Sequence, residues 1–239
     1  MTPIGTIDFE TRSEVNLLKV GAYKYAEDPS TVVLCMAYNV NGFSELWYPG
    51  DPDPEELLDW IESGGLMEAH NSFFEHCIWA MVIPRDFLWP EMPLEQWRCS
   101  MAKCRYNSIP GSLDKAGSAT NLDTLKDKRG KQLIKLLSVP QKVAKGKLKR
   151  WEKGNGLEIG SDVYKLTEIS TGLPMLEYLE QRDGVAGVFN HDTFAWNDDP
   201  VLLEEMGAYC VQDVETEMAL SYVLDEMPQT EIDIWILDQ

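Results

Sequence analysis

Apolar and polar positions in the first third of the chain follow the pattern of a β-sheet. Residues 3–10 predict a buried strand, and TVVLCMAYNV at residues 31–40 is the clearest strand pattern in the sequence. FSELWYPG at residues 43–50 follows an Asn-Gly pair, which favours a tight hairpin turn. These segments predict antiparallel strands, with residues 12–30 as an excursion between the first two.

Strand and helix patterns alternate after this region. LMEAH at residues 66–70 predicts a short strand, and Pro140 ends a later helix. Residues 141–162 are rich in Lys and Gly without periodicity, which predicts a mobile loop. The order of elements predicts an α/β fold, with a mixed sheet of about five strands and flanking helices in one domain, residues 1–239. Helices are predicted at residues 54–61, 72–82, 97–106, 112–118, 131–138, 174–182 and 199–226.

Two acids share one face of the first predicted strand. Asp8 and Glu10 are two residues apart and point to the same side, whereas Ile7 and Phe9 point to the other. Buried carboxylates without partners are costly unless protons or cations neutralise them. The alternative is an edge strand whose acidic face is solvated.

Two predicted helices each carry one acid within a mostly apolar stripe. The alternative for Glu75 is that the helix dipole favours an acid in the first turn of a helix, without any metal. Asp213 lies four residues after Tyr209, and its alternative is a slightly rotated helix that leaves it at the solvent edge. We expect Glu215 and Glu217 to mark the solvent side, which argues against that rotation. The stripes are Asn71, Phe74, Glu75, Ile78 and Val82, and Leu202, Met206, Tyr209, Asp213, Thr216 and Leu220.

Four acids on the inward faces of three elements require cations. Asp8, Glu10, Glu75 and Asp213 offer the hard oxygen ligands that suit Mg²⁺ or Mn²⁺. Two such ions roughly 4 Å apart would hold both the attacking and the leaving oxygen of a phosphodiester. The Tyr209 hydroxyl would orient the attacking water.

Charge is unevenly distributed along the chain. The formal net charge is −19, which argues against a passive DNA-coating protein, although bound metal ions reverse the sign locally. Between Lys126 and Lys153, however, eleven Lys and Arg stand against two acids. This basic segment is a candidate phosphate-binding region, with a solvated loop as the alternative. Its expected DNA contacts include Lys145, Lys147, Lys149 and Arg150.

The five cysteines include no CxxC pair, which predicts a reduced protein of the cytoplasm without a disulfide framework or zinc site. The N-terminus lacks the basic and apolar regions of a signal peptide. No run approaches the roughly 18 apolar residues of a membrane span. We therefore expect no membrane partner.

Three motifs together resemble the DEDDy branch of the 3′–5′ exonucleases, which have a ribonuclease-H-like fold. IDFET at residues 7–11, HNSFFE at 70–75 and YCVQD at 209–213 stand in the order of that family. Residues 109–140 also resemble the segment between the second and third motifs in bacteriophage family A DNA polymerases, so the resemblance is to their proofreading domain. Residues 228–239 resemble the junction to a polymerase domain, and residues 126–165 would be a basic insertion.

The resemblance implies a role for each motif residue. Asp8 would bridge two divalent ions, Mg²⁺ or Mn²⁺, with Glu10 and Asp213 as further ligands of the tighter one. The acid of the second motif, usually Asp but here Glu75, would hold the other ion mostly through water, and Tyr209 would position the nucleophile. Around them Thr11 would seat the 3′-terminal nucleotide and Asn71 would contact the strand nearby. Beside the second motif, Phe73 and Phe74 are candidate wedges against the terminal bases, with core packing as the alternative for at least one of them.

The expected activity is hydrolysis of the terminal phosphodiester of single-stranded or frayed DNA, which is proofreading when a polymerase is attached. An exoribonuclease of the same superfamily is an alternative, although no partner for a 2′-hydroxyl is identifiable in the sequence. A non-catalytic module that grips DNA for a polymerase is another. The complete set of acids argues against that last alternative.

Overall fold

A five-stranded mixed sheet forms the centre of the molecule. The computed structural model describes residues 4–122, 128–142, 166–168 and 194–239. The strand order is β3-β2-β1-β4-β5, with antiparallel pairing from β1 through β2 to β3 and parallel pairing from β1 through β4 to β5. The strands are β1 (Ile4–Arg12), β2 (Val32–Asn39), β3 (Ser44–Trp47), β4 (Leu66–Ala69) and β5 (Trp97–Cys99).

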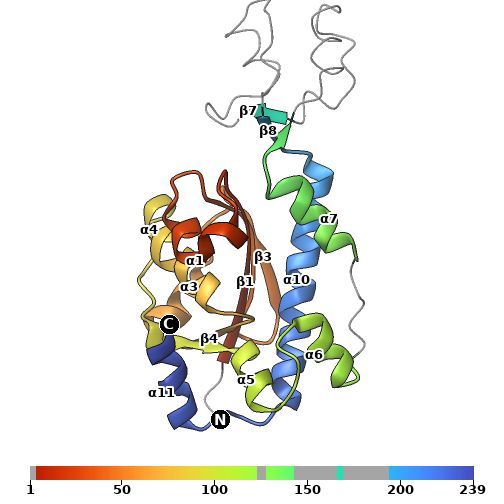
Figure 1. Cartoon of the computed structure of the whole chain (residues 1–239). Coiled ribbons are helices and arrows are strands. Elements are labelled where there is room, and N and C mark those ends of the chain that lie inside the picture. Colours follow the sequence, from red (N-terminus) through yellow and green to blue (C-terminus); the bar gives the residue numbers. More distant parts are fainter. Residues whose placement is uncertain (1–3, 123–127, 143–165, 169–193) are drawn as a thin grey trace, which may run out of the picture.

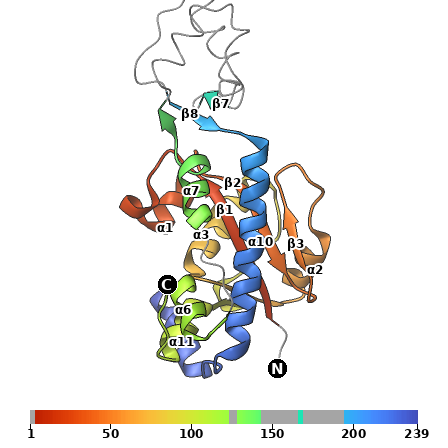
Figure 2. The same ribbon diagram turned by 90° about the vertical axis from the view of Figure 1, so that its right-hand side faces the viewer.

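Helices cover both faces of this sheet (Figure 1). On one face lie α1 (Leu17–Glu27), α3 (Phe73–Met81) and α4 (Ile83–Asp86). On the other, the long helix α10 (Pro200–Val223) crosses β1 and β2, with α7 (Lys128–Leu137) beside it (Figure 2). This is the predicted α/β architecture, consistent with a ribonuclease-H-like fold. The remaining helices are α2 (Glu55–Glu62), η1 (Leu94–Gln96), α5 (Ser100–Tyr106), α6 (Leu113–Ala119) and α11 (Gln229–Asp238).

Each face of the sheet has its own apolar core. Ile7 and Phe9 of β1 pack with Trp79 of α3 in the larger core. On the opposite face, Cys35 of β2 packs with Cys210 of α10 in a smaller one. Because β1 contributes to both sides, its alternate residues are buried in different environments.

The structure differs from the predicted elements at several points. Residues 17–27, within the predicted excursion, form α1, with a kink at Gly21. The predicted helix at 97–106 begins as strand β5, because Trp97 and Cys99 are buried where β5 pairs with β4. Helix α11 was not predicted.

A second, three-stranded sheet was also not predicted. Its order is β6-β8-β7, with β6 at Gln141–Lys142, β7 at Leu166–Glu168 and β8 at Phe194–Asn197. β6 begins the segment predicted as a mobile loop, and the rest of that segment lies outside the described residues, as does the predicted helix at 174–182. None of the described helices has the length and apolar character needed to cross a membrane.

Candidate active site

Strand β1 directs Asp8 and Glu10 toward helix α10. Asp8 pairs with Ala37 and Glu10 with Cys35, so both acids project on the side of the smaller core. The strand register shifts immediately after Glu10, where one extra residue of β2 forms a bulge. Glu10 is buried and Asp8 is half-buried, which excludes the fully solvated edge strand.

Helix α10 brings the third-motif residues to these acids. The Cys210 thiol lies 3.3 Å from Oδ2 of Asp8 and 3.4 Å from its carbonyl oxygen. Tyr209 donates a hydrogen bond to Asp213 one turn further on, and Asp213 is half-buried. The negative charge of Asp213 acts on Glu10 and adds to the rise in its pKa, so the two acids belong to one electrostatic cluster.

Glu75 completes the predicted set from the first turn of α3. Its side chain is only 4% exposed, and its Oε2 atom has no hydrogen-bond partner among the described residues. Asn71 is exposed and adopts a left-handed conformation, with φ of 70°, just before the helix. Ser72 occupies the N-cap position, and Asn71 immediately precedes it.

Burial makes the charged forms of these acids unfavourable. It raises the pKa of Asp8 from 3.8 to about 6, although the hydrogen bond with Cys210 acts in the opposite direction. Burial, followed by the charge of Asp8, also raises the pKa values of Glu10 and Glu75 well above the usual range. Divalent cations would relieve this repulsion.

The chemistry of these side chains fits a divalent ion. All four acids present hard oxygen ligands, and the unpartnered Oε2 of Glu75 is an orphaned acceptor of the kind that a cation or its water would satisfy. As the side chains stand, no three Asp, Glu, His or Cys residues in the described part of the chain converge closely enough to coordinate one ion. Ion binding would therefore draw the carboxylates together.

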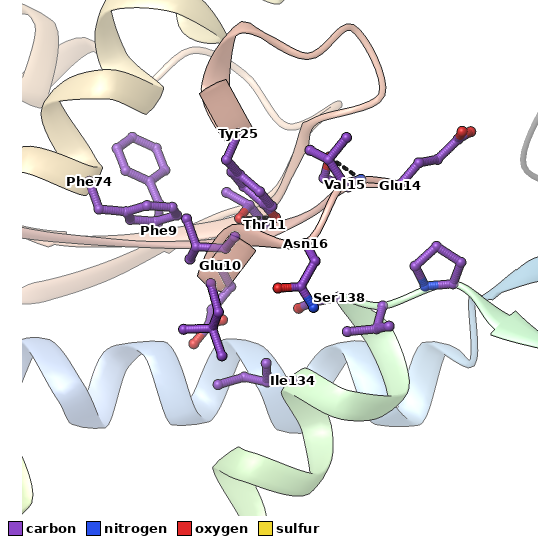
Figure 3. Close-up of a pocket in the computed structure, with 15 residues that line it drawn as sticks. Phe9, Glu10, Thr11, Glu14, Val15, Asn16, Tyr25, Phe74, Ile134 and Ser138 are labelled. Carbon is purple, nitrogen blue, oxygen red and sulfur yellow. Dashed lines mark hydrogen bonds between the residues drawn. The ribbon is translucent and has the colours of Figure 1, made fainter. Parts of the chain in front are cut away.

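A cavity of about 450 Å³ opens beside Glu10 (Figure 3). Thr11, Tyr25 and Phe74 line it from the sheet and its helices, and Ile134 of α7 lies on the opposite side. The Thr11 hydroxyl is 3.0 Å from the Tyr25 hydroxyl, so this predicted nucleotide contact is fixed by a second residue. Asn71 does not line the cavity.

Gly130 of α7 packs directly against the ring of Tyr209. A Cβ atom at Gly130 would lie 2.3 Å from the Tyr209 ring, so only glycine permits this approach. Burial raises the pKa of Tyr209 above its usual value, and the charge of Asp213 and the hydrogen bond to it add to the effect. The phenol therefore keeps its proton near neutral pH.

The prediction that Glu217 lies on the solvent side of α10 is wrong. Glu217 does not mark the solvent side of α10: it is 2% exposed and lies on the buried stripe of the helix, whereas Glu215 is exposed. The sequence also contained no signal for Glu68, which is 3% exposed on β4. The predicted basic contacts Lys145, Lys147, Lys149 and Arg150 lie outside the described residues.

The chain is similar in sequence to a phage protein named DNA polymerase. No protein-family model matches it. The chain is 31% identical over 241 aligned residues to a protein named DNA polymerase from Bacillus phage SP02. The alignment covers 98% of this chain but only 30% of that polymerase. The chain is thus similar, over nearly its whole length, to one part of a phage DNA polymerase.

Proposed function

We propose that this chain is a metal-dependent 3′–5′ exonuclease that removes nucleotides from single-stranded or frayed DNA ends. The observation that carries the proposal is the cluster of acids from β1, α3 and α10 beside an open cavity, in which burial and mutual repulsion raise the pKa values of Glu10 and Glu75. Similarity to a phage DNA polymerase supports DNA as the substrate and proofreading as the context.

Each acid has a role in this proposal. Two bound divalent ions would supply positive charge to the attacking and leaving oxygens of the phosphodiester. Asp8, Glu10, Glu75 and Asp213 would hold these ions through their carboxylate oxygens. The pKa values of Asp8, Glu10 and Glu75, which are raised in the free protein, would fall if cations stabilised the ionised forms.

Tyr209 positions the attacking water and does not deprotonate it. Its raised pKa keeps the hydroxyl protonated, and Asp213 fixes the direction of that hydroxyl. A neutral phenol in a fixed position holds a water molecule in line with the scissile bond without supplying a base. When bound, the ions would supply the positive charge that lowers the pKa of this water.

The cavity beside Glu10 would receive the 3′-terminal nucleotide. Tyr25 and Phe74 lie at its wall with ring centroids 6.0 Å apart, and aromatic faces of this kind stack on bases regardless of sequence. The volume is within the range of pockets that enclose small ligands. Because base stacking is sequence-tolerant, we expect degradation of all four terminal nucleotides.

A degradation assay on 5′-labelled single-stranded DNA tests the proposal. The chain would be incubated with Mg²⁺, with Mn²⁺ or with chelator, beside an RNA strand of the same sequence. We expect a ladder that shortens by single nucleotides from the 3′ end and disappears with chelator. Preferential shortening of RNA would favour the exoribonuclease alternative, and no cleavage with either ion would contradict the proposed activity.

A further inference from the structure

The buried acids continue past the four that the sequence singled out. Glu217 of α10 and Glu68 of β4 are both almost fully buried. The charge of Glu68, and to a smaller extent those of Glu75 and Asp8, acts on Glu217. Glu217 therefore interacts electrostatically with both the predicted cluster and a further acid, and the motifs do not include it.

Strand register and helix contacts explain this placement. Thr6 of β1 pairs with Glu68, so Glu68 shares the sheet face of Asp8, which is two residues further along β1. Helix α10 contacts Asp8 through Cys210 and contacts Glu68 through Ser221, whose hydroxyl donates a 3.1 Å hydrogen bond. Glu217 lies between these two contacts, seven residues after Cys210 and four before Ser221, on the same side of the helix.

Several of these buried acids have carboxylate oxygen atoms without a hydrogen-bond partner among the described residues. Within the described part of the chain, three buried glutamates each have one carboxylate oxygen without a hydrogen-bond partner: Glu68 Oε1, Glu75 Oε2 and Glu217 Oε1. A buried acceptor of this kind costs free energy unless a proton, water or ion satisfies it. The Glu217 side chain accepts a hydrogen bond from Ser100, and this bond leaves Oε1 able to accept another ligand.

The nearby Lys103 donates its hydrogen bonds to groups other than Glu217. Lys103 is 3% exposed, and its ammonium donates to the carbonyl and hydroxyl oxygens of Ser221, at 3.0 Å each, and to Glu226 at 2.7 Å. These three hydrogen bonds use all the donors of the ammonium group. Lys103 therefore ties α10 to α5 and donates no hydrogen bond to Oε1 of Glu217.

We propose that Glu217 is a fifth acidic residue of the metal centre, holding the ion beside Glu75 through a water molecule. The inference rests on the metal centre of the proposed function. Mg²⁺ retains several of its waters and needs only one or two protein carboxylates. Glu75 and Glu217 can therefore serve one ion even though no three side chains among the described residues converge on a point.

Manganese titration of the full chain tests this assignment. Binding would be followed by calorimetry and by the electron paramagnetic resonance signal of free Mn²⁺, for the unmodified chain, Glu217→Gln and the control Glu215→Gln. Glu215 is two residues away on the same helix but is exposed. Loss of a residue that acts through water costs about 10- to 100-fold in metal affinity. We expect the affinity for the more weakly bound Mn²⁺ to fall by this factor in Glu217→Gln and to stay unchanged in Glu215→Gln.

A competing explanation is that Glu217 only shares a proton with Glu68. In that case Glu217→Gln and Glu68→Gln would both raise the unfolding temperature in chelator and leave Mn²⁺ binding unchanged, which would overturn the proposal. Absence of any Mn²⁺ binding by the unmodified chain would also overturn it. If Mn²⁺ binding depends on Glu217 but DNA is never cleaved, the ion site stands and the exonuclease proposal fails.

Discussion

Asp8 is a residue that weakens the metal-free fold and is nonetheless required by the proposed chemistry. Its pKa is higher in the folded chain than the ordinary value of 3.8, because burial disfavours the carboxylate. The folded state therefore binds this proton more tightly than the unfolded state does. Ionising Asp8 lowers the stability of the metal-free protein as the pH rises from 3.8 through about 6.

The first prediction concerns Asp8→Asn, which removes the charge and keeps the shape. In chelator at pH 7.5, the variant should unfold at a higher temperature than the unmodified chain, by about 2–4 °C for each kcal/mol relieved. At pH 4 this advantage should shrink, since Asp8 is then protonated in the folded protein. DNA cleavage with Mn²⁺ should fall at least about a thousandfold, as expected for removal of a central catalytic group.

Differential scanning fluorimetry at the two pH values and the labelled-strand assay measure the two effects. Asp59→Asn, on the exposed side of α2, is a matched control that should change neither. Retention of cleavage by Asp8→Asn would contradict the two-ion assignment, whatever happens to the stability.

The second prediction concerns Tyr209→Phe. Because the Tyr209 ring packs against Gly130 of α7, removal of the hydroxyl should leave the ring in place, and it removes none of the proposed metal ligands. Cleavage should slow by about a hundredfold, within the range for removal of a group that positions a proton-transfer partner. Mn²⁺ affinity should persist. Tyr222→Phe, an exposed tyrosine on the same helix, is the control, and an unchanged rate for Tyr209→Phe would remove the water-positioning role.

Among the elements, the crossing of α7 and α10 sets the position of the third motif. Leu133 and Leu137 of α7 are buried against Met206 and Val214 of α10. Gly130 extends that packing surface one turn earlier and faces the ring of Tyr209. Helix α7 can therefore control the geometry of the site by fixing where the Tyr209 ring lies.

The third prediction follows from that packing. Gly130→Ala should favour helix formation by about 1 kcal/mol, because glycine is the poorer helix former. Its methyl group, however, would displace the Tyr209 ring, and a misplacement of this kind costs about a hundredfold in rate. We expect slower cleavage without loss of folding, measured by circular dichroism and the labelled-strand assay.

Gln132→Ala is the control, since this neighbouring side chain on α7 is exposed and uncharged. It should leave the rate unchanged. If Gly130→Ala cleaved DNA as fast as the control, α7 would have no part in placing Tyr209.

For the molecule as a whole, the net negative charge must be compatible with the proposed DNA substrate. A net charge of −19 repels DNA, whereas the basic segment between Lys126 and Lys153 provides the local positive charge that could attract it. Part of that segment forms α7, which lies beside the cavity and helix α10. The rest of the basic segment follows α7 directly in the sequence, and α7 borders the cavity proposed to receive the DNA end.

The fourth prediction concerns Lys145, Lys147 and Lys149. Changing all three to Gln should weaken single-stranded DNA binding and reduce the salt dependence of the logarithm of affinity by roughly 0.7 for each phosphate that is no longer neutralised. Fluorescence anisotropy over a range of salt concentrations measures this slope. Neutralising Lys24 and Lys115, which are exposed elsewhere, should change the slope little. An unchanged slope for the triple variant would make the segment a solvated loop.

The first four strands of the central sheet and the shared face of Asp8 and Glu10 could be predicted from the amino-acid sequence, whereas strand β5 lies within a segment whose pattern predicts a helix. A strand has a period of two, so Asp8 and Glu10 had to share a face opposite Ile7 and Phe9. The first turn of α3 similarly combined Glu75 with apolar neighbours that had to be buried. Local periodicity suffices where one face of an element is plainly apolar.

The buried face of α10, in contrast, is selected by tertiary contacts. This helix carries apolar residues on several sides, so its period does not define one buried stripe, and Glu217 was assigned to solvent by mistake. The rotation of α10 is determined by Cys210 against Asp8, Ser221 against Glu68, and Gly130 against Tyr209. These pairs join residues far apart in the chain, and no local pattern encodes them.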